Sequence, residues 1–379
     1  MTDKFEDMAN ARGSALNGRE LLNELMEAYR KYVILPSEHA YRAAALHVAS
    51  THGQPAWYTA PRFQYRAPEK RSGKTRAQTV HRYLSYKPLQ TVNISPAALA
   101  RTIGTDDPPT LHMDEYDTYF GSRNGDKHED LRGIINSGFE RGGSYTRWDM
   151  MARQLEQIPT FCMVTLAGIG ELPDTVADRS VTINMRRRAR GEEVAPFRAR
   201  HKAPLEQLGQ KVNLWVRRNL QLLKDVEPDL PVEDRAADVW EPLIAIADLA
   251  GGEWVDLGRE ACVALTGERK DTTVPREVEL LRDLHIAFGD DESVHTAVLI
   301  DRLSKLDESL WRKVQRMGGA EFITPTVTDR EISKVLQDYD HNIRSAKIRK
   351  GDVVKQGYKR ADLEDAWRRH CTCGGCSGS

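Results

Sequence analysis

The sequence predicts an α/β protein in which a parallel sheet is flanked by helices and followed by a helical bundle and a small C-terminal unit. Between residues 57 and 200, short apolar runs typical of strands alternate with segments typical of helices. Such alternation indicates a parallel sheet that is covered on both faces. Beyond residue 200 the strand-like runs fade, and apolar residues recur at helical spacing. We therefore expect a helical lid or bundle over 201–290 and a compact unit over 291–370.

The individual elements follow from periodicity and from helix breakers. A flexible leader, 1–18, precedes N-terminal helices over 19–56, where Ser37 is placed to cap the second helix. In the core, strands are expected at 63–67, 90–94, 110–113, 160–167 and 181–185, and helices at 75–85, 96–103 and 131–139. Further helices are expected at 205–215, 240–249, 294–304, 308–316 and 328–339, before a basic hairpin and a tail, 371–379.

The composition excludes several classes of protein. Hydrophobic residues make up 40% of the chain and its net charge is −1, so any nucleic-acid surface must be a local patch. The chain has no run near the ~18 apolar residues that a membrane span needs, and its first residues have no apolar signal-peptide core. The five cysteines indicate no disulfide framework. We therefore expect a protein of the reducing cytoplasm that does not bind membranes.

A phosphate-binding loop is indicated between the first core strand and its helix. Residues Pro68-Glu69-Lys70-Arg71-Ser72-Gly73-Lys74-Thr75 fit the Walker A pattern of P-loop proteins, except that Pro68 replaces the first glycine. Gly73 lets the backbone approach phosphates, and the helix start offers N–H groups and the positive end of its dipole. We expect Lys74 to reach the β- and γ-phosphates of ATP, Thr75 to bind Mg²⁺, and Arg76 to lie beside the nucleotide. The alternative is a basic turn that binds no nucleotide.

Two acids, Asp114 and Glu115, end the third expected strand. Acids at the end of a buried strand are costly unless a cation or a function uses them. We expect Asp114 to bind Mg²⁺ through water and Glu115 to act as the general base that polarises the attacking water. The alternative is a solvated strand end. The two motifs together, in this order, predict an ATPase.

Further candidates would stabilise charge on the transferred phosphoryl group or sense the nucleotide. Arg179 is the first candidate for an arginine that a neighbouring subunit inserts into the site, and Arg141 is the next. An ion pair between Arg179 and a neighbouring aspartate is the alternative. Thr165 is the candidate for a polar sensor at the end of the fourth strand. Arg235, in the helical region, is the candidate for a second sensor.

The C-terminal unit is typical of a winged helix, because a helix precedes a strongly basic hairpin that carries a single acid, Asp352. Such a density of positive charge suits contacts with DNA phosphates, mostly without sequence preference. A solvated hairpin, or one that contacts a protein, is the alternative. The tail holds Cys371, Cys373 and Cys376, which are too crowded to predict a zinc site. The expected DNA-binding residues are Arg344, Lys347, Arg349, Lys350, Lys355, Lys359 and Arg360.

Together these segments resemble a P-loop ATPase family of unknown function that is common in actinobacterial chromosomes, prophages and actinophages. Its domain is often linked to primase-polymerase modules. The resemblance implies a RecA-like or AAA+-like core, similar in layout to replicative helicases that form rings, usually hexamers, and move on DNA. Arg71 departs from the family, where glycine is more usual. The resemblance rests on residues 67–75, 93–99, 110–120, 131–138, 167–188 and 240–252 and on the region of Gly357 and Tyr358.

The sequence therefore predicts an ATP- and Mg²⁺-dependent motor on single-stranded or forked DNA, a helicase of phage, prophage or plasmid origin. A homo-oligomeric ring and a primase-polymerase are the expected protein partners. A regulatory or anti-phage defence ATPase that switches protein assembly without unwinding DNA is the main alternative. A DNA-binding scaffold with a decayed P-loop is a weaker one, which Pro68 and Arg71 keep open.

Overall fold

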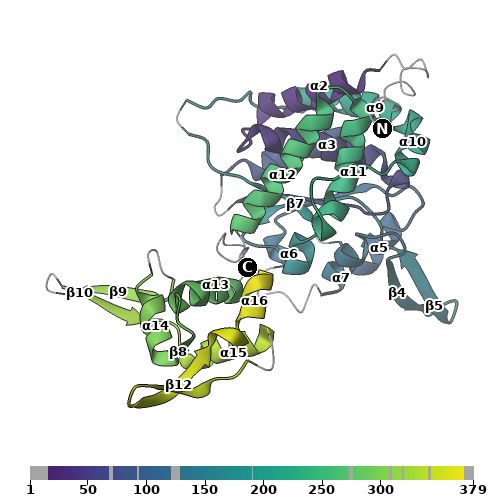
Figure 1. Ribbon diagram of the computed structural model, residues 1–379. Helices are drawn as coiled ribbons and strands as arrows, with labels where there is room; N and C mark the ends of the chain where they lie inside the picture. Colours follow the sequence, from purple (N-terminus) through teal and green to yellow (C-terminus); the bar gives the residue numbers. More distant parts are fainter. Residues whose placement is uncertain are drawn as a thin grey trace. The chain divides into compact units, whose positions relative to one another are not determined.

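The computed structural model describes residues 16–67, 71–91, 94–120, 129–189, 191–272, 276–306, 310–317, 320–339 and 343–370. The chain forms two compact units, Met1–Arg269 and Lys270–Ser379. The N-terminal helices, the sheet and the helical region therefore belong to one unit (Figure 1). The expected boundary at 290 is too late, because the helix Arg276–Phe288 packs in the second unit.

The first unit is built on a parallel sheet of five strands in the order β2-β3-β6-β1-β7. The five strands expected from the sequence are confirmed, with shifted ends. Their carboxyl ends all lie at one end of the sheet, which we call the carboxyl end; the opposite end is the amino end. The strands are β1 (Arg62–Ala67), β2 (Pro88–Thr91), β3 (Thr110–Asp114), β6 (Val164–Ile169) and β7 (Ser180–Asn184).

Helices cover both faces of the sheet (Figure 1). One face carries the larger apolar core, which includes Phe63 and Tyr65 of β1 and the helices α2 (Gly18–Tyr32), α3 (Glu38–His52), α4 (Lys74–Leu84), α9 (Lys202–Arg218), α11 (Asp234–Ala250) and α12 (Trp254–Thr272). The other face carries a smaller core with Leu111 and Val164 and the helices α5 (Pro96–Ile103), α6 (Asp117–Phe120), α7 (Glu129–Ser137) and α8 (Asp174–Ala177). The short helix α10 (Leu220–Asp225) follows α9.

Local signals set where these helices begin. Ser37 caps α3 as expected, because its side chain accepts a hydrogen bond from the backbone N–H of Ala40. Ser95 caps α5 in the same way, with Pro96 at the first helical position. Within the described part of the chain, no helix is both long enough and apolar enough to cross a membrane.

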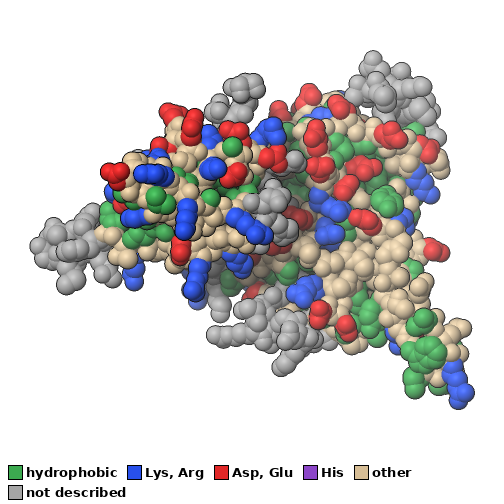
Figure 2. Space-filling view, turned by 60° about the horizontal axis from the view of Figure 1, so that its bottom comes forward, with side chains coloured by type: hydrophobic (Ala, Val, Ile, Leu, Met, Phe, Trp, Pro, Cys, Tyr) green, Lys and Arg blue, Asp and Glu red, His purple; other side chains and the backbone are tan. Residues whose placement is uncertain are grey.

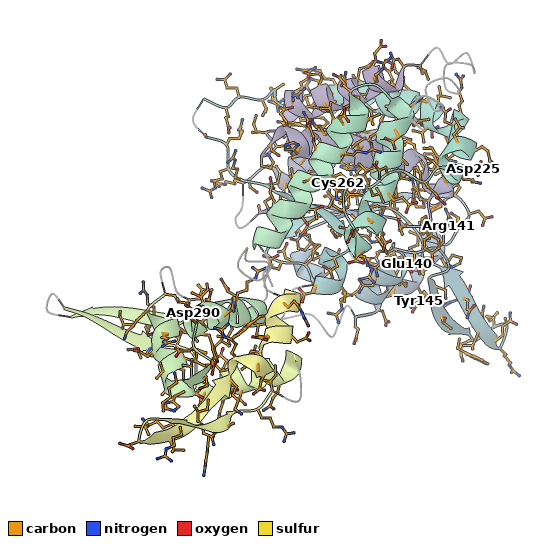
Figure 3. All side chains as sticks on the ribbon, in the orientation of Figure 1. Glu140, Arg141, Tyr145, Asp225, Cys262 and Asp290 are labelled. Atoms are coloured by element: carbon orange, nitrogen blue, oxygen red, sulfur yellow. The ribbon has the colours of Figure 1, made fainter. Side chains whose placement is uncertain are left out.

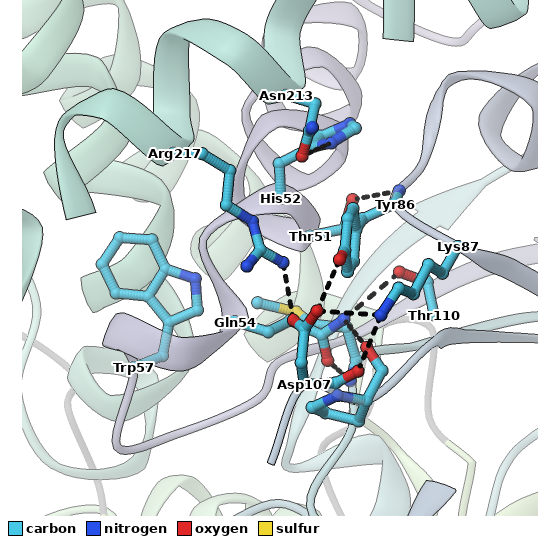
Figure 4. Close-up of polar contacts among 12 residues, drawn as sticks. Thr51, His52, Gln54, Trp57, Tyr86, Lys87, Asp107, Thr110, Asn213 and Arg217 are labelled. Carbon is cyan, nitrogen blue, oxygen red and sulfur yellow. Dashed lines mark hydrogen bonds and ion pairs between the residues drawn. The ribbon is translucent and has the colours of Figure 1, made fainter. Parts of the chain in front are cut away.

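A polar cluster fixes the entry to β3 (Figure 4). The Asp107 carboxylate accepts hydrogen bonds from the Tyr86 hydroxyl at 2.5 Å, the Lys87 ammonium at 2.8 Å and the Arg217 guanidinium at 2.6 Å. Burial alone would raise the pKa of Asp107, but these three hydrogen bonds lower it to about 2. The cluster ties α9 to the end of α4 and so supports the sheet from its amino end.

An antiparallel hairpin, β4 (Ser144–Asp149) and β5 (Gln154–Pro159), extends from the first unit, and the sequence did not predict it (Figure 1). Neither strand presents a continuous buried face, so the apolar alternation typical of a strand is missing. Large apolar side chains stand exposed near its tip, where Figure 2 shows a group of hydrophobic surface. They are Trp148 at 54%, Met150 at 80%, Met151 at 95% and Leu155 at 64% exposed.

In its described residues, the second unit combines a three-stranded antiparallel sheet, in the order β11-β12-β8, with four α-helices and a separate hairpin. The expected basic hairpin is confirmed as β11 and β12. The expected helix at 308–316 is wrong: the segment contains the strand β9, and the buried Trp311 donates to the Asp283 carboxylate at 2.5 Å. The elements are α13 (Arg276–Phe288), β8 (Ser293–His295), α14 (Thr296–Ser304), β9 (Arg312–Met317), β10 (Ala320–Pro325), α15 (Asp329–Tyr339), β11 (Ala346–Lys350), β12 (Val353–Lys359) and α16 (Glu364–His370).

Candidate functional site

The start of α4 presents its first backbone N–H groups at the carboxyl end of the sheet. Gly73 precedes the helix with φ at 85°, a left-handed conformation that glycine adopts without strain, and it forms no side-chain cap. Arg71 has φ at 66° and therefore occupies a backbone region that suits glycine better. Three residues predicted to contact nucleotide, Pro68, Glu69 and Lys70, lie outside the described residues.

Side chains on the first turn of α4 differ in exposure. Lys74 is 9% exposed and Ser72 is 4% exposed, whereas Thr75 is exposed. Arg76 is half-buried, and its guanidinium lies over the Phe197 ring, 5.4 Å from the ring centroid. The first turn carries no acid to compete with an anionic ligand. Such a helix start is an anion-binding site by its dipole and its backbone N–H groups.

The acidic pair lies where β3 ends. Asp114 is the last residue of β3, and one of its carboxylate oxygens accepts the backbone N–H of Glu115 at 2.9 Å. Glu115 is exposed and has φ at 55°. A non-glycine residue in this left-handed region costs ~1–3 kcal/mol, and such strain is concentrated at functional sites.

The two motifs lie on one sheet with a single strand between them. β6 pairs with β1 on one side and with β3 on the other, so β1 and β3 are roughly 10 Å apart at the usual strand spacing. In addition, β7 lies on the opposite side of β1 from the other strands. In open parallel sheets, ligands bind at the carboxyl end where the strand order reverses in this way.

Gln78 ties α4 directly to the end of β3. Its buried amide donates to the carbonyl of Met113, the residue before Asp114, at 2.8 Å, and to the carbonyl of Thr165 at 3.2 Å. Lys74 lies one turn earlier on the same face of the helix, because residues four apart share a face. Lys74 and Asp114 therefore both lie beyond the Gln78–Met113 contact, toward the carboxyl end of the sheet. Lys74 lies one helical turn beyond it on α4, and Asp114 lies one residue beyond it on β3. Sequence reasoning did not identify Gln78.

Two more charged residues lie at this end of the sheet. Arg66, near the end of β1, forms an ion pair with Glu171, after β6, at 2.5 Å. Beside the loop, the backbone N–H of Met185 donates to the Arg66 carbonyl at 2.7 Å, and the Met185 side chain lies 3.7 Å from where a Cβ on Gly73 would be. The exposed arginines 186–188 follow directly.

Arg179 lies at the opposite end of the sheet from Lys74. It directly precedes β7, and its guanidinium donates to the Thr175 carbonyl at 2.7 Å and stacks over Phe139, 5.6 Å from the ring centroid. Instead of an ion pair, its described contacts are therefore a carbonyl and a ring. Arg179 therefore lies away from the start of α4 in its own chain.

Arg141 and Arg235 also lie away from Lys74, and both make contacts within their own chain. Arg141 lies at the amino end, along the segment that leads into β4 (Figure 3), and its guanidinium donates to the carbonyls of Gln54 and Trp57 and stacks on Phe161. These contacts use the guanidinium within its own chain, so Arg141 supports the fold. Arg235 forms ion pairs with Glu140 at 3.0 Å and Asp238 at 3.2 Å, again away from Lys74.

Thr165 does not end its strand as expected. β6 begins later than predicted and runs to Ile169, which places Thr165 second in the strand. Its side chain is fully buried in the middle of the sheet, where its hydroxyl has no hydrogen-bond partner among the described residues. A polar sensor would have to come from the end of β6, where Gly170 and Glu171 follow.

Buried histidines lie behind the site. His47 on α3 and His81 on α4 share a hydrogen bond of 3.0 Å, and the His81 ring also bonds the Tyr65 hydroxyl at 3.0 Å. The ring of His112 on β3 lies 6.0 Å from that of His81, and neither of its nitrogens has a partner among the described residues. Burial lowers the pKa of His47 to about 4, that of His112 to about 3 and that of His81 well below 6.5. All three are therefore neutral near pH 7.

The cations of the basic hairpin in the second unit differ in whether they also contact other residues of that unit. Lys350 forms an ion pair with Asp291 at 2.9 Å. Arg360 donates to the carbonyls of Asp291 and Gly289 and lies over the Trp367 ring, so its guanidinium contacts its own unit. The exposed cations on or beside the hairpin are Arg344, Lys347, Arg349, Lys350, Lys355 and Lys359.

Metal binding at the site would use few protein ligands. Among the described residues, no group of three His, Cys, Asp or Glu side chains could hold a metal ion. The Thr75 hydroxyl and the Asp114 carboxylate are oxygen donors of the kind that Mg²⁺ prefers, and Mg²⁺ in phosphate sites commonly takes one or two protein ligands with phosphates and water. The residues present therefore fit a magnesium–nucleotide complex.

The fold and the described site define a parallel α/β protein whose acidic strand tip and open helix start share one end of the sheet. The model of a family described as a protein of unknown function (DUF3631) matches residues 184–370. An uncharacterized 28.9 kDa protein in the xis 5′ region of Saccharopolyspora erythraea is 40% identical over 190 residues, which are 49% of this chain and 68% of that protein. The chain belongs to the same family as that protein.

Two solved structures are similar over much of the chain. The apo C-terminal region of NrS-1 is 10% identical, with a TM-score of 0.42, over 90% of this chain and 75% of that one. An inhibitor-bound JCV helicase is 14% identical, with a TM-score of 0.23, over 74% of this chain and 75% of that one.

Proposed function

We propose that the protein is an ATPase that converts ATP and water to ADP and phosphate and uses this reaction to act on DNA, as a helicase of replication type. The observation that carries the proposal is the junction of α4 and β3. Gln78 joins the two elements. Lys74 lies one helical turn, and Asp114 one residue, further toward the carboxyl end of the same sheet. A triphosphate held at the start of α4 would therefore reach the acidic pair.

Each residue of this junction has a role in the proposed reaction. The N–H groups of the first turn of α4 and the Lys74 ammonium bind the phosphates. Thr75 and Asp114 hold Mg²⁺, which when bound neutralises phosphate charge. Glu115 accepts a proton from the attacking water as the bond from water oxygen to the γ-phosphorus forms and the bond to the leaving ADP oxygen breaks.

Arg179 supports a ring as the active assembly. Because Arg179 lies at the amino end, at the far end of the sheet from its own Lys74, it would stabilise the γ-phosphoryl group of a neighbouring subunit. We propose a homo-oligomeric ring, a hexamer, in which each nucleotide lies between two subunits. A primase-polymerase is the protein partner that the family resemblance implies. Origin in a phage, prophage or plasmid accords with the name of the relative, which places it in the xis 5′ region.

Two surfaces supply the proposed DNA contacts. The first is the basic hairpin β11–β12, with order β11-β12-β8 and preceding helix α15 as in a winged helix, where Lys347, Arg349 and Lys355 are exposed. The second is the β4–β5 hairpin, whose exposed Trp148 and neighbouring methionines offer a surface on which unpaired bases can stack. Together they provide the phosphate contacts and the stacking contacts that single-stranded DNA needs.

One experiment separates the candidate functions: ATP turnover by the purified chain with and without single-stranded DNA, followed by strand displacement. DNA-stimulated turnover with displacement is the expected result. Turnover that DNA does not change would favour the regulatory or defence ATPase. DNA binding without turnover would favour the scaffold with a decayed P-loop.

The hairpin contact has its own matched test. Replacing Trp148 and Met150 by serine is expected to reduce stimulation by DNA while basal turnover stays the same, because these side chains are exposed and distant in sequence from the site. The control is Leu214→Ser, which removes an apolar side chain that is 50% exposed on α9. Equal DNA stimulation in the hairpin variant and the control would exclude the hairpin from DNA binding.

A further inference from the structure

The turn that carries Glu115 is bonded to the end of β6. The backbone N–H of Tyr116 donates to the Ala167 carbonyl at 3.1 Å, and the Asp117 carboxylate accepts the backbone N–H of Ile169 at 3.0 Å. Within the turn, the Thr118 backbone N–H donates to the Glu115 carbonyl at 2.9 Å. The backbone on both sides of Glu115 is therefore fixed, although its own side chain is exposed.

The side chain of Tyr116 adds a buried hydrogen-bond chain across the sheet. Tyr116 is 0% exposed, and its hydroxyl donates to the Gly170 carbonyl at 2.7 Å and accepts from the Gln64 amide at 2.7 Å. The Gln64 carbonyl oxygen in turn accepts from the Thr182 hydroxyl at 3.0 Å. This chain joins the turn after β3 to the end of β6, to β1 and to β7.

The Tyr116 ring also fills a space that only glycine leaves open. A Cβ added at Gly168 would lie 2.6 Å from the Tyr116 ring, closer than real contacts allow. Burial raises the pKa of Tyr116 to about 12, so its hydroxyl stays protonated and can donate. The packing of the ring against Gly168 and the two hydrogen bonds of the hydroxyl together fix the orientation of the Tyr116 side chain.

We propose that Tyr116 is a positioning residue that holds Glu115 in its left-handed conformation and so aims the Glu115 carboxylate at the attacking water. Glutamate gains nothing intrinsically from this conformation, so the neighbouring contacts must impose it. A displacement of only ~1 Å at a reacting group lowers rates by about 100-fold. The inference rests on the ATPase function proposed above, and it names a residue that acts through Glu115 without touching the substrate.

The test is Tyr116→Phe, which keeps the ring and removes the hydroxyl. The matched control is Tyr65→Phe, because Tyr65 is also fully buried in the sheet, lies on the opposite face of β1 from Gln64, and bonds Tyr29 and His81. We expect kcat to fall by about tenfold or more in Tyr116→Phe while the ATP dissociation constant changes less than about twofold. The control is expected to lower the melting temperature with kcat unchanged.

A double variant separates positioning from general loss of stability. Gln64→Leu removes the amide that donates to Tyr116, so it is expected to lower kcat as well. Because both changes break the same chain, the double variant should be no slower than the slower single variant. Effects that multiply, or an unchanged kcat in Tyr116→Phe when the wild type turns over ATP, would overturn the proposal.

Hydrogen exchange keeps the proposal testable if the ATPase function itself fails. Absence of turnover in the wild type would contradict the function and not the positioning. Exchange at the backbone amides of Tyr116 and Ile169 is then expected to be faster in Tyr116→Phe than in Tyr65→Phe, since both amides bond across the turn. Equal exchange in the two variants would overturn the positioning role.

Discussion

The two ends of the central sheet carry charged residues that are held in different ways. At the amino end, the guanidinium groups of Arg62 and Arg141 donate hydrogen bonds to backbone carbonyls of their own chain. At the carboxyl end, the Lys74 ammonium and the Glu115 carboxylate form no ion pair with another described residue. The two arginines therefore stabilise the fold at the amino end, whereas Lys74 and Glu115 at the carboxyl end stay available for a ligand.

Arg62 shows how far the structural use goes. Its side chain is fully buried at the start of β1, donates to the carbonyls of Ala60, Ile135 and Cys162, and has a pKa lowered to about 10 by burial. A buried charge is tolerated because several acceptors surround it. At the carboxyl end, Glu115 differs from Arg62 in both respects. Its side chain is exposed, and its backbone adopts a strained left-handed conformation.

The largest expected effect is at the carboxyl end. Glu115→Gln removes the proposed general base, so kcat should fall by about 10²–10⁴-fold while ATP still binds. Steady-state turnover and equilibrium ATP binding check this, with Glu260→Gln, an exposed glutamate on α12, as the control. If Glu115→Gln hydrolyses ATP at the wild-type rate, Glu115 is not the base.

Arg62 and Arg179 both lie at the amino end, but we expect their replacement to have different effects. Arg62→Met leaves three buried carbonyls without their donor and should lower the free energy of unfolding by about 3 kcal/mol or more. Arg179→Ala removes a half-buried residue with one carbonyl contact, so it should cost about 1 kcal/mol or less in stability and yet abolish turnover in the proposed ring. Denaturant unfolding and ATP turnover of both variants test this; normal turnover in Arg179→Ala would remove it from catalysis.

The buried histidines predict a loss of stability in mild acid. Their folded pKa values lie below the unfolded value of 6.5, so between those values the unfolded chain binds more protons than the folded chain. Stability is thus fully present above pH 6.5 and falls as the pH drops toward 4, by up to roughly 1.4 kcal/mol per pH unit for each histidine. His112→Leu should flatten this dependence, because neither nitrogen of His112 has a described partner. Unfolding curves between pH 7 and 5 that are identical for both proteins would exclude His112 as a source.

The smallest expected effect is at the cluster around Asp107. Asp107→Asn keeps the shape and removes the charge that Lys87 and Arg217 share, so it should cost about 1 kcal/mol, reduced because the carboxylate is partly exposed to solvent. Its lowered pKa means that the contribution is present above pH 3.8 and is lost as the pH falls toward 2. Stability of wild type and variant at pH 7 and at low pH measures the difference, which should vanish at the lower pH.

Sequence periodicity predicted much of the fold because strands such as β3 and β6 are short, mostly apolar runs between clear breakers. Ser37 as a cap and Asp114 at the end of β3 were predictable for the same reason, since both follow from local chemistry. The hairpin β4–β5 was missed because neither of its faces is buried. The site was predicted only in part. Gln78 and Tyr116 act through contacts with residues far away in the sequence, which spacing along the chain does not encode.

Placement at one end of the sheet or the other was the feature that the sequence predicted least well. In the sequence, Arg141, Arg179 and Arg235 look alike, because each is an arginine near glycine or acidic residues. Their separation from Lys74 depends on where β1 and β7 begin, and the sequence places those strand ends only to within a few residues. Thr165 was misplaced for the same reason, because β6 starts four residues later than its apolar run.

The most direct test of nucleotide binding at the start of α4 is titration calorimetry, which measures the equilibrium binding of Mg-ATP to wild type and Lys74→Ala. The control is Lys211→Ala, which removes an exposed lysine of α9. We expect the wild type and the control to bind, and Lys74→Ala to bind about 10- to 100-fold more weakly with an unchanged melting temperature. Equal affinity in all three proteins, or no binding by the wild type, would contradict nucleotide binding at the start of α4.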